Sequence, residues 1–312
     1  MSVSLTLTAS LSAVAAPLVS PLLAGWLALA CTGCNGYLPG EDWRGYERTA
    51  LAMGKMRIER APGGMPVSRQ ALADNFRRIA FGIEHDVIAP GDPAASEGGR
   101  LRRWLKPVRW HLVSLGQDAP AHAAMVGETA DRIARATGHD IREARTGEPS
   151  NLTILVLRPE DYGKTRQVFS QRPGGGWLAA QVDRFGRAPH TPCVGIFLHA
   201  VTPEAGRADE ILYALAVIRA GLPPRLGQAC IEEEMAQAMG LPNDDERVRP
   251  SVFNDDQEFA LLTGHDEALL RILYDQRLSA GMTEDEAMQI VPKIIAGMDT
   301  RGFDGRAALE RE

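Results

Sequence analysis

The segment from Ile231 to Asp244 reads I-E-E-E-M-A-Q-A-M-G-L-P-N-D, and it constrains the fold more than any other part of this chain. We expect a helix from about Gly227 to Met239, because Gly and Pro follow it at positions 240 and 242 and both residues end helices. Glu233 and Gln237 are four residues apart, so their side chains share one face of this helix. Glu234 lies about 100° around the helix from that face.

The segment resembles the zinc-binding helix of zinc proteases, H-E-x-x-H-x-x-G-x-x-H/D, whose Glu is the general base. In this chain Glu233, Gln237 and Asn243 stand at the three ligand positions, whereas the base Glu234 and the turn Gly240 are retained. Zinc is usually held by His or Cys ligands, and sites made only of oxygen ligands favour Ca, Mg or Mn instead. We therefore expect no stoichiometric zinc and no other cofactor.

Three functional classes remain open. The first is a catalytically silent protein that binds a peptide, a cell-wall fragment or an envelope protein. The second is an unconventional hydrolase, with Glu234 as base, Glu233 and Gln237 as metal or substrate ligands, and Asn243 or Asp244 as a third ligand. The third is a purely structural envelope protein, in which the carboxylates only stabilise a helix N-terminus.

The rest of the chain predicts an α/β (or α+β) architecture. Strands are expected at Pro107 to Leu115, Leu152 to Leu157, Cys193 to His199 and about Glu210 to Ile218. Helices are expected from Ser68 to about His85 and from Ala119 to Thr137. This order predicts a mixed sheet with a crossover helix. We expect a linker over residues 32–66 that becomes a strand near Met56 to Glu59, a domain over 67–285 and a helical tail over 286–312.

Two wider resemblances follow from these residues. The order of strands and the signature helix is similar to the upper half of a metzincin-type protease, with Phe253 at the position of the Met-containing turn. The segment Phe259 to Asp275 is similar to the C-terminal helix of matrix-metalloprotease-like domains, with Thr263 as N-cap, Asp266 in a capping-box-like pair, and Leu269, Ile272 and Leu273 on the buried face. The resemblance implies a zincin-like fold with a C-terminal helical subdomain.

From Met56 to Met282 the chain also resembles a proteobacterial lipoprotein-like family, catalogued as domain of unknown function 2927. The segments N-F-R-R-I-A-F, R-W-L-K-P-V-R, C-I-E-E-E-M-A-Q-A-M-G-L-P-N-D, R-P-S-V-F-N-D and L-Y-D-Q-R-L-S-A-G-M carry this resemblance. It implies the fold and a location in the cell envelope, and it implies no activity.

The N-terminal composition is typical of an exported protein. Leu11 to Cys31 is a run of 21 residues without a charge, broken by two Pro residues. Residues 1–31 are therefore interpreted as a signal segment that is cleaved, lipidated at Cys31 or kept as an anchor, which would be the only contact with a membrane. Cys193 and Cys230 form an even pair, which predicts a disulfide between them, and two buried thiols are the alternative. A net charge of −6 without a basic block argues against nucleic-acid binding.

Overall fold

The computed structural model describes residues 42–63, 65–82, 99–171, 175–199, 209–254 and 256–298. The predicted signal segment 1–31, with the lipidation candidate Cys31, lies outside these residues. Within them, no helix has both the length and the apolar composition needed to span a membrane.

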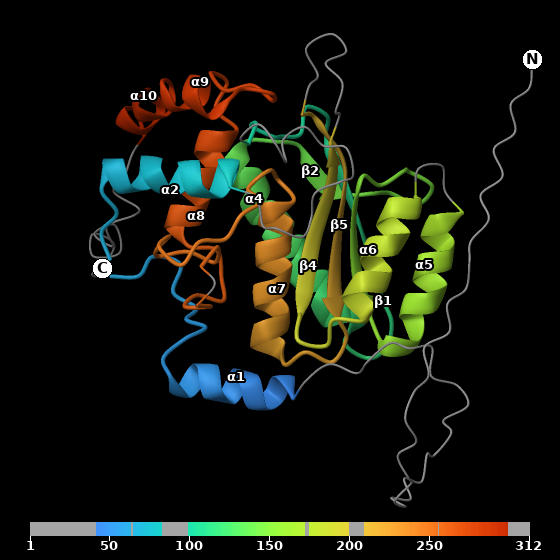
Figure 1. Cartoon of the computed structure of the whole chain (residues 1–312). Helices are drawn as coiled ribbons and strands as arrows, with labels where there is room; N and C mark the ends of the chain where they lie inside the picture. The colour runs from blue at the N-terminus through green and yellow to red at the C-terminus, as the bar shows by residue number, and fades with distance from the viewer. Residues whose placement is uncertain are drawn as a thin grey trace, which may run out of the picture. The chain divides into compact units, whose positions relative to one another are not determined.

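One five-stranded mixed sheet organises the described chain (Figure 1). Its strands are β1 (Val108–Ser114), β2 (Ile141–Glu143), β3 (Leu152–Leu157), β4 (Cys193–His199) and β5 (Ile211–Arg219), in the order β2-β1-β3-β5-β4. The pairs β1/β2, β1/β3 and β3/β5 are parallel, and β4 pairs with β5 in antiparallel orientation. Helix α4 (Ala119–Thr137) makes the crossover that the parallel pair β1/β2 requires. The prediction of a mixed α/β sheet is confirmed.

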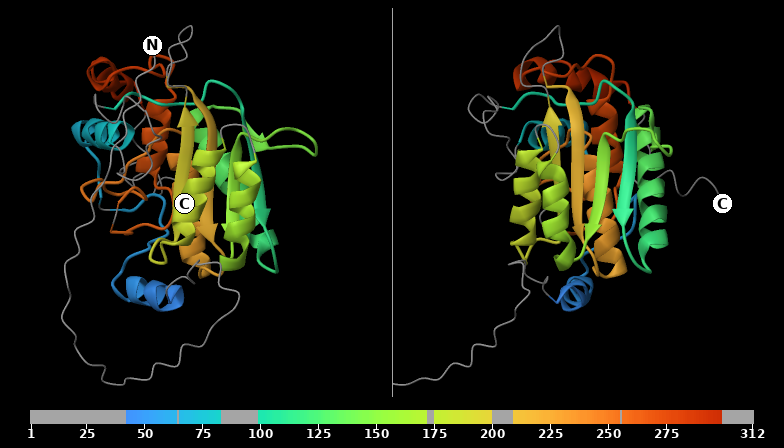
Figure 2. Two further views of the ribbon diagram at one scale, coloured as in Figure 1. Left: turned by 45° about the vertical axis from the view of Figure 1, so that its right-hand side comes forward. Right: turned by 90° about the vertical axis from the view of Figure 1, so that its right-hand side faces the viewer.

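Both faces of the central strands are buried, and their side chains alternate between two hydrophobic clusters. Ile154 and Val156 of β3 pack in the larger cluster, whereas Leu155 and Leu157 pack in the smaller one on the opposite face. This alternation is the two-residue period of a strand. Helices α4 and α7 (Pro224–Gln237) cover the first face, and α5 (Tyr162–Ser170) and α6 (Gly176–Gly186) cover the second (Figure 2).

Two helices on the second face were absent from the sequence prediction, which named no helix or strand between Leu157 and Cys193. Helix α5 follows a short 3₁₀ turn (Pro159–Asp161), and α6 packs Leu178, Val182 and Phe185 into the smaller cluster. The spacing of these three residues is helical. The sequence pattern was present there, and the prediction overlooked it.

The predicted linker over residues 32–66 is wrong for its described part. Helix α1 (Trp43–Ala52) begins at the N-cap Asp42 and buries Trp43 and Ala50 against Leu226 and Ala260. The expected strand at Met56 to Glu59 is also wrong, because the bridge from Arg57 to Phe259 is isolated there. A helix of ten residues is too short to be stable alone, so its stability comes from these tertiary contacts.

The remaining helices pack on one another, and α8 (Gly264–Leu273) packs on α4. Helix α2 (Arg69–Phe81) ends four residues before the predicted His85. Helix α8 has the predicted capping box of Thr263 and Asp266, and its predicted apolar face is fully buried. Helix α9 (Glu284–Met288) spans the expected boundary between residues 285 and 286, and α10 (Val291–Ala296) packs on α2 and α8. The described part of the tail therefore belongs to the domain.

Candidate functional site

Helix α7 carries the candidate site and ends in a turn that only glycine can make. Gly240 has φ +110°, and a Cβ there would lie 2.1 Å from the carbonyl oxygen of Arg102. The Trp104 indole N–H donates to the carbonyl of Ala238 at 2.8 Å, which satisfies one of the free carbonyls at the helix end. The helix thus begins three residues earlier and ends two residues earlier than predicted, and the turn lies where the sequence placed it.

The first glutamate of the triplet is structural. The Glu232 side chain is only 1% exposed. Its carboxylate accepts two hydrogen bonds from the Arg60 guanidinium, at 2.7 and 2.8 Å, and a third from the backbone N–H of Leu262 at 2.7 Å. This carboxylate therefore joins α7 to the segment after α1 and to the segment before α8.

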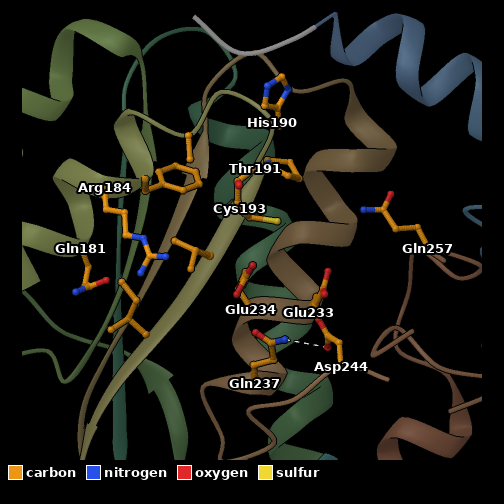
Figure 3. A pocket seen from close by; sticks show the side chains of 15 residues that line it. Gln181, Arg184, His190, Thr191, Cys193, Glu233, Glu234, Gln237, Asp244 and Gln257 are labelled. Carbon is orange, nitrogen blue, oxygen red and sulfur yellow. Dashed lines mark hydrogen bonds between the residues drawn. The ribbon is translucent and has the colours of Figure 1, made fainter. Parts of the chain in front are cut away.

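The other two glutamates face a cleft of about 370 Å³ beside the edge strand β4. Figure 3 shows Glu233, Glu234 and Gln237 pointing into it from α7, with Asp244 opposite Gln237. Cys193, Val194 and Ile196 of β4 form its floor, and Gln181 and Arg184 of α6 form its far wall. Four of the five predicted site residues are thus brought together.

Gly195 of β4 makes room for the polar side chains of α7. A Cβ on Gly195 would lie 2.5 Å from Glu234 Oε2 and 3.3 Å from Gln237 Oε1. Glu234 and Gln237 are 5% and 6% exposed, so both lie against the strand at the bottom of the cleft. Any side chain at position 195 would displace the Glu234 carboxylate.

Asn243, the residue aligned with the third zinc ligand, is not part of the cleft. Its Nδ2 donates to the carbonyl of Arg78 at 3.1 Å and so closes the last turn of α2. Asp244 lines the cleft instead, and its Oδ1 accepts a hydrogen bond from Gln237 Nε2 at 3.0 Å. Of the two residues that the sequence left open as a third ligand, only Asp244 faces Glu233 and Glu234.

The side chains at the aligned ligand positions do not fit a zinc ion. Two of the three aligned positions hold amides, and both amides donate hydrogen bonds within the protein. Among the described residues, no group of three or more His, Cys, Asp or Glu side chains is arranged to hold a metal ion. Gln237 is neutral, and an amide oxygen is a much weaker zinc ligand than imidazole or thiolate.

A disulfide between Cys193 and Cys230 ties β4 to α7 next to the cleft, with the two Cα atoms 5.8 Å apart. The predicted pairing is confirmed. The bond lies one turn before Glu234, so it fixes the distance between the acidic face of α7 and the edge strand.

Sequence reasoning missed the wall formed by α6 and by the loop before β4. Arg219 holds that loop: its guanidinium donates to the carbonyls of Thr191 and Phe185, at 2.7 and 3.0 Å, and lies 4.7 Å from the centre of the Phe185 ring. Burial lowers the pKa of Arg219, although arginine remains protonated at neutral pH. The helical spacing in residues 176–186 was the signal that would have predicted this wall.

Helix α1 borders the opposite end of the cleft. The Tyr46 hydroxyl donates to Oε1 of Gln257, a residue of the cleft wall, at 2.7 Å. Burial raises the pKa of Tyr46, Lys55 acts in the opposite sense, and the negative charge of Glu233 adds to the increase. The N-terminal helix and the acidic face of α7 are therefore electrostatically coupled.

Residues 69–293 match the model of the family described as Protein of unknown function (DUF2927), and the chain belongs to this family. Neither the curated proteins nor the solved structures contain a significant match.

Proposed function

We propose that this member of the DUF2927 family acts in the cell envelope by binding an extended peptide in the cleft beside β4 without hydrolysing it. The domain would then be a degenerate zincin-like domain that keeps the signature helix and lacks the zinc ligands. The observation that carries this proposal is that two residues aligned with zinc ligands, Gln237 and Asn243, make hydrogen bonds within the protein instead. Gln237 donates to Asp244, and Asn243 closes the end of α2.

The position of β4 supports an extended ligand. This strand is the edge of the described sheet, and the cleft runs along it between α6 and α7. An edge strand offers backbone N–H and carbonyl groups to an added strand, and neighbouring pockets then select its side chains. Glu233, Glu234 and Asp244 would favour a peptide with basic side chains.

Two observations support an envelope location. The described chain holds its two cysteines in a disulfide, a bond that persists in oxidising compartments. The uncharged run from Leu11 to Cys31 has the composition of an export segment.

The test is a binding and cleavage assay on the full chain. Fluorescent decapeptides that carry zero to four basic residues would be titrated by anisotropy, and each mixture would then be analysed by mass spectrometry for cleavage. We expect the basic peptides to bind, to remain intact, and to lose affinity when alternate backbone nitrogens are methylated. Glu233→Gln should weaken binding, whereas the matched change Glu160→Gln, at an exposed site on the 3₁₀ turn, should leave it unchanged.

Two outcomes would overturn the proposal. Equal affinity for methylated and unmethylated peptides would exclude strand addition. Metal-dependent cleavage that disappears in Glu234→Gln would favour the alternative, a hydrolase in which Glu234 is the general base.

A further inference from the structure

The two walls of the cleft beside β4 carry opposite charges. Among the described residues that line the cleft, the acidic side chains are Glu233, Glu234 and Asp244, which come from α7 and the segment after it. The one Lys or Arg side chain among these lining residues is Arg184, on α6. Figure 3 shows Arg184 on one side of β4 and Glu233 and Glu234 on the other. A ligand in the cleft therefore meets a cation on the α6 wall and carboxylates on the α7 wall.

The packing of α6 places Arg184 on its wall. Gln181 and Arg184 are three residues apart and share one face of the helix, which lines the cleft. Val182 lies on another face and is completely buried in the smaller hydrophobic cluster, so it fixes the rotation of α6. Arg184 also lies in the last turn of α6, where a positive charge is favourable. The cation of this wall is therefore held in place by the fold.

The pleat of β4 alternates between the same two walls. Ile196 packs in the smaller cluster, on the face that α6 covers. Cys193 and Gly195 point to the other face, because Cys193 is bonded to Cys230 of α7 and a Cβ on Gly195 would lie 2.5 Å from Glu234 Oε2. Side chains that are directly opposite each other on paired strands share a face. Successive side chains of a peptide paired with β4 would therefore face α7 and α6 in turn.

We infer that the cleft selects an extended peptide in which basic and acidic side chains alternate. The basic side chains face the carboxylates of α7, and the acidic side chain between them faces Arg184, whose guanidinium can donate two hydrogen bonds to one carboxylate. This inference rests on the proposed function and adds the order of the charges to it. A peptide with basic residues only would place every second cation on the side of Arg184, and this repulsion would select against it.

The first test compares two fluorescent decapeptides of the same composition on the full chain. One has the central order Lys-Glu-Lys-Glu-Lys and the other has Lys-Lys-Lys-Glu-Glu, between the same neutral residues. Their net charges are equal, so the general attraction to an acidic protein is equal too. In the second order, one Lys faces the α6 wall and one Glu faces the α7 wall. Because an exposed ion pair contributes up to about fivefold, we expect anisotropy to show about tenfold tighter binding of the alternating peptide.

Reversing the charge of the α6 wall should reverse this preference. In Arg184→Glu both walls are acidic, so a decapeptide with five consecutive Lys should bind about tenfold more tightly than it binds the wild type. Misfolding cannot produce such a gain of affinity. The matched control is Arg135→Glu, since Arg135 is an exposed arginine in the last turn of α4 and does not line the cleft. This variant has the same net charge and should keep the wild-type preference for the alternating order.

Two results would overturn the inference and leave the proposed function intact. The first is equal binding of the two charge orders to the wild type. The second is the same gain for the five-Lys peptide in Arg135→Glu as in Arg184→Glu, because the effect would then come from net charge alone. If neither charge order bound at all, and the peptides with other numbers of basic residues also failed to bind, the proposed function would fall together with the inference.

Discussion

The two sides of α7 use the same residue type for opposite purposes. On the side toward α8, the buried Glu232 carboxylate accepts hydrogen bonds from Arg60 and from the backbone N–H of Leu262. On the side toward β4, Glu233 and Glu234 face a cleft, and the strand gives up a side chain at Gly195 to make room. Of three consecutive glutamates, Glu232 therefore makes a structural contact, whereas Glu233 and Glu234 belong to a candidate binding surface. The element that packs against each face of α7 decides between the two roles.

On the side of α7 that faces β4, we expect the Cys193–Cys230 disulfide to contribute most to the free energy of unfolding. Replacing both Cys193 and Cys230 by Ser removes a link across 37 residues, and the loop-entropy model gives a loss of about 4 kcal/mol in the free energy of unfolding. Guanidinium unfolding of the oxidised wild type and of the double variant measures this loss. A loss below about 1 kcal/mol would mean that packing alone holds β4 against α7.

On the side of α7 that faces α8, we expect the ion pair of Glu232 with Arg60 to contribute most to the free energy of unfolding. Glu232→Gln leaves Arg60 without its carboxylate in a mostly buried position, and we expect a loss of about 3 kcal/mol. Glu234→Gln is the matched change on the other side, and its effect should stay within about 1 kcal/mol because removing one of two neighbouring carboxylates relieves repulsion. Urea unfolding of both variants makes the comparison. Equal losses would refute the division between the two sides.

The sequence predicted β1, β3, β4, α4 and the capping box of α8 closely, because each has a strong local pattern. It did not predict α1, since the stability of that helix comes from Leu226 and Ala260, which are distant in the chain. The sequence also could not show which of Asn243 and Asp244 lines the cleft. Asn243 turns to the carbonyl of Arg78, a partner 165 residues away, and no local spacing encodes that choice.

Gly195 tests the close contact between β4 and α7. In Gly195→Ala the new methyl carbon would lie 2.5 Å from Glu234 Oε2, which is closer than two such atoms can pack, so the carboxylate must move. We expect a loss of about 1 kcal/mol that is largely absent in the background Glu234→Ala, which is a coupling of the size measured for residues in contact. A double-mutant cycle in urea gives this coupling. Additive effects would show that the carboxylate is not held against the strand.

Asp245, next to the cleft residue Asp244, should give the smallest effect, visible only in acid. The Arg247 guanidinium, with Arg78 3.6 Å away, lowers the pKa of Asp245 to about 2. A carboxylate with a lowered pKa stabilises the fold above its unfolded pKa of about 4, and this contribution is lost as the pH falls from about 4 to about 2. Asp245→Asn should therefore flatten the pH dependence of the unfolding free energy in that window. An unchanged slope would contradict the assignment.

The central proposal is that this chain has a helix like the signature helix of zinc proteases without a zinc site, and the zinc content of the purified full chain tests it most directly. After extensive dialysis, elemental analysis should give far less than one zinc per chain, because losing three imidazole ligands costs much more than the 10–100-fold that follows the loss of one supporting contact. Gln237→Ala should leave that low value unchanged. About one zinc per chain, lost in Gln237→Ala, would contradict the proposal and place a metal beside Glu234.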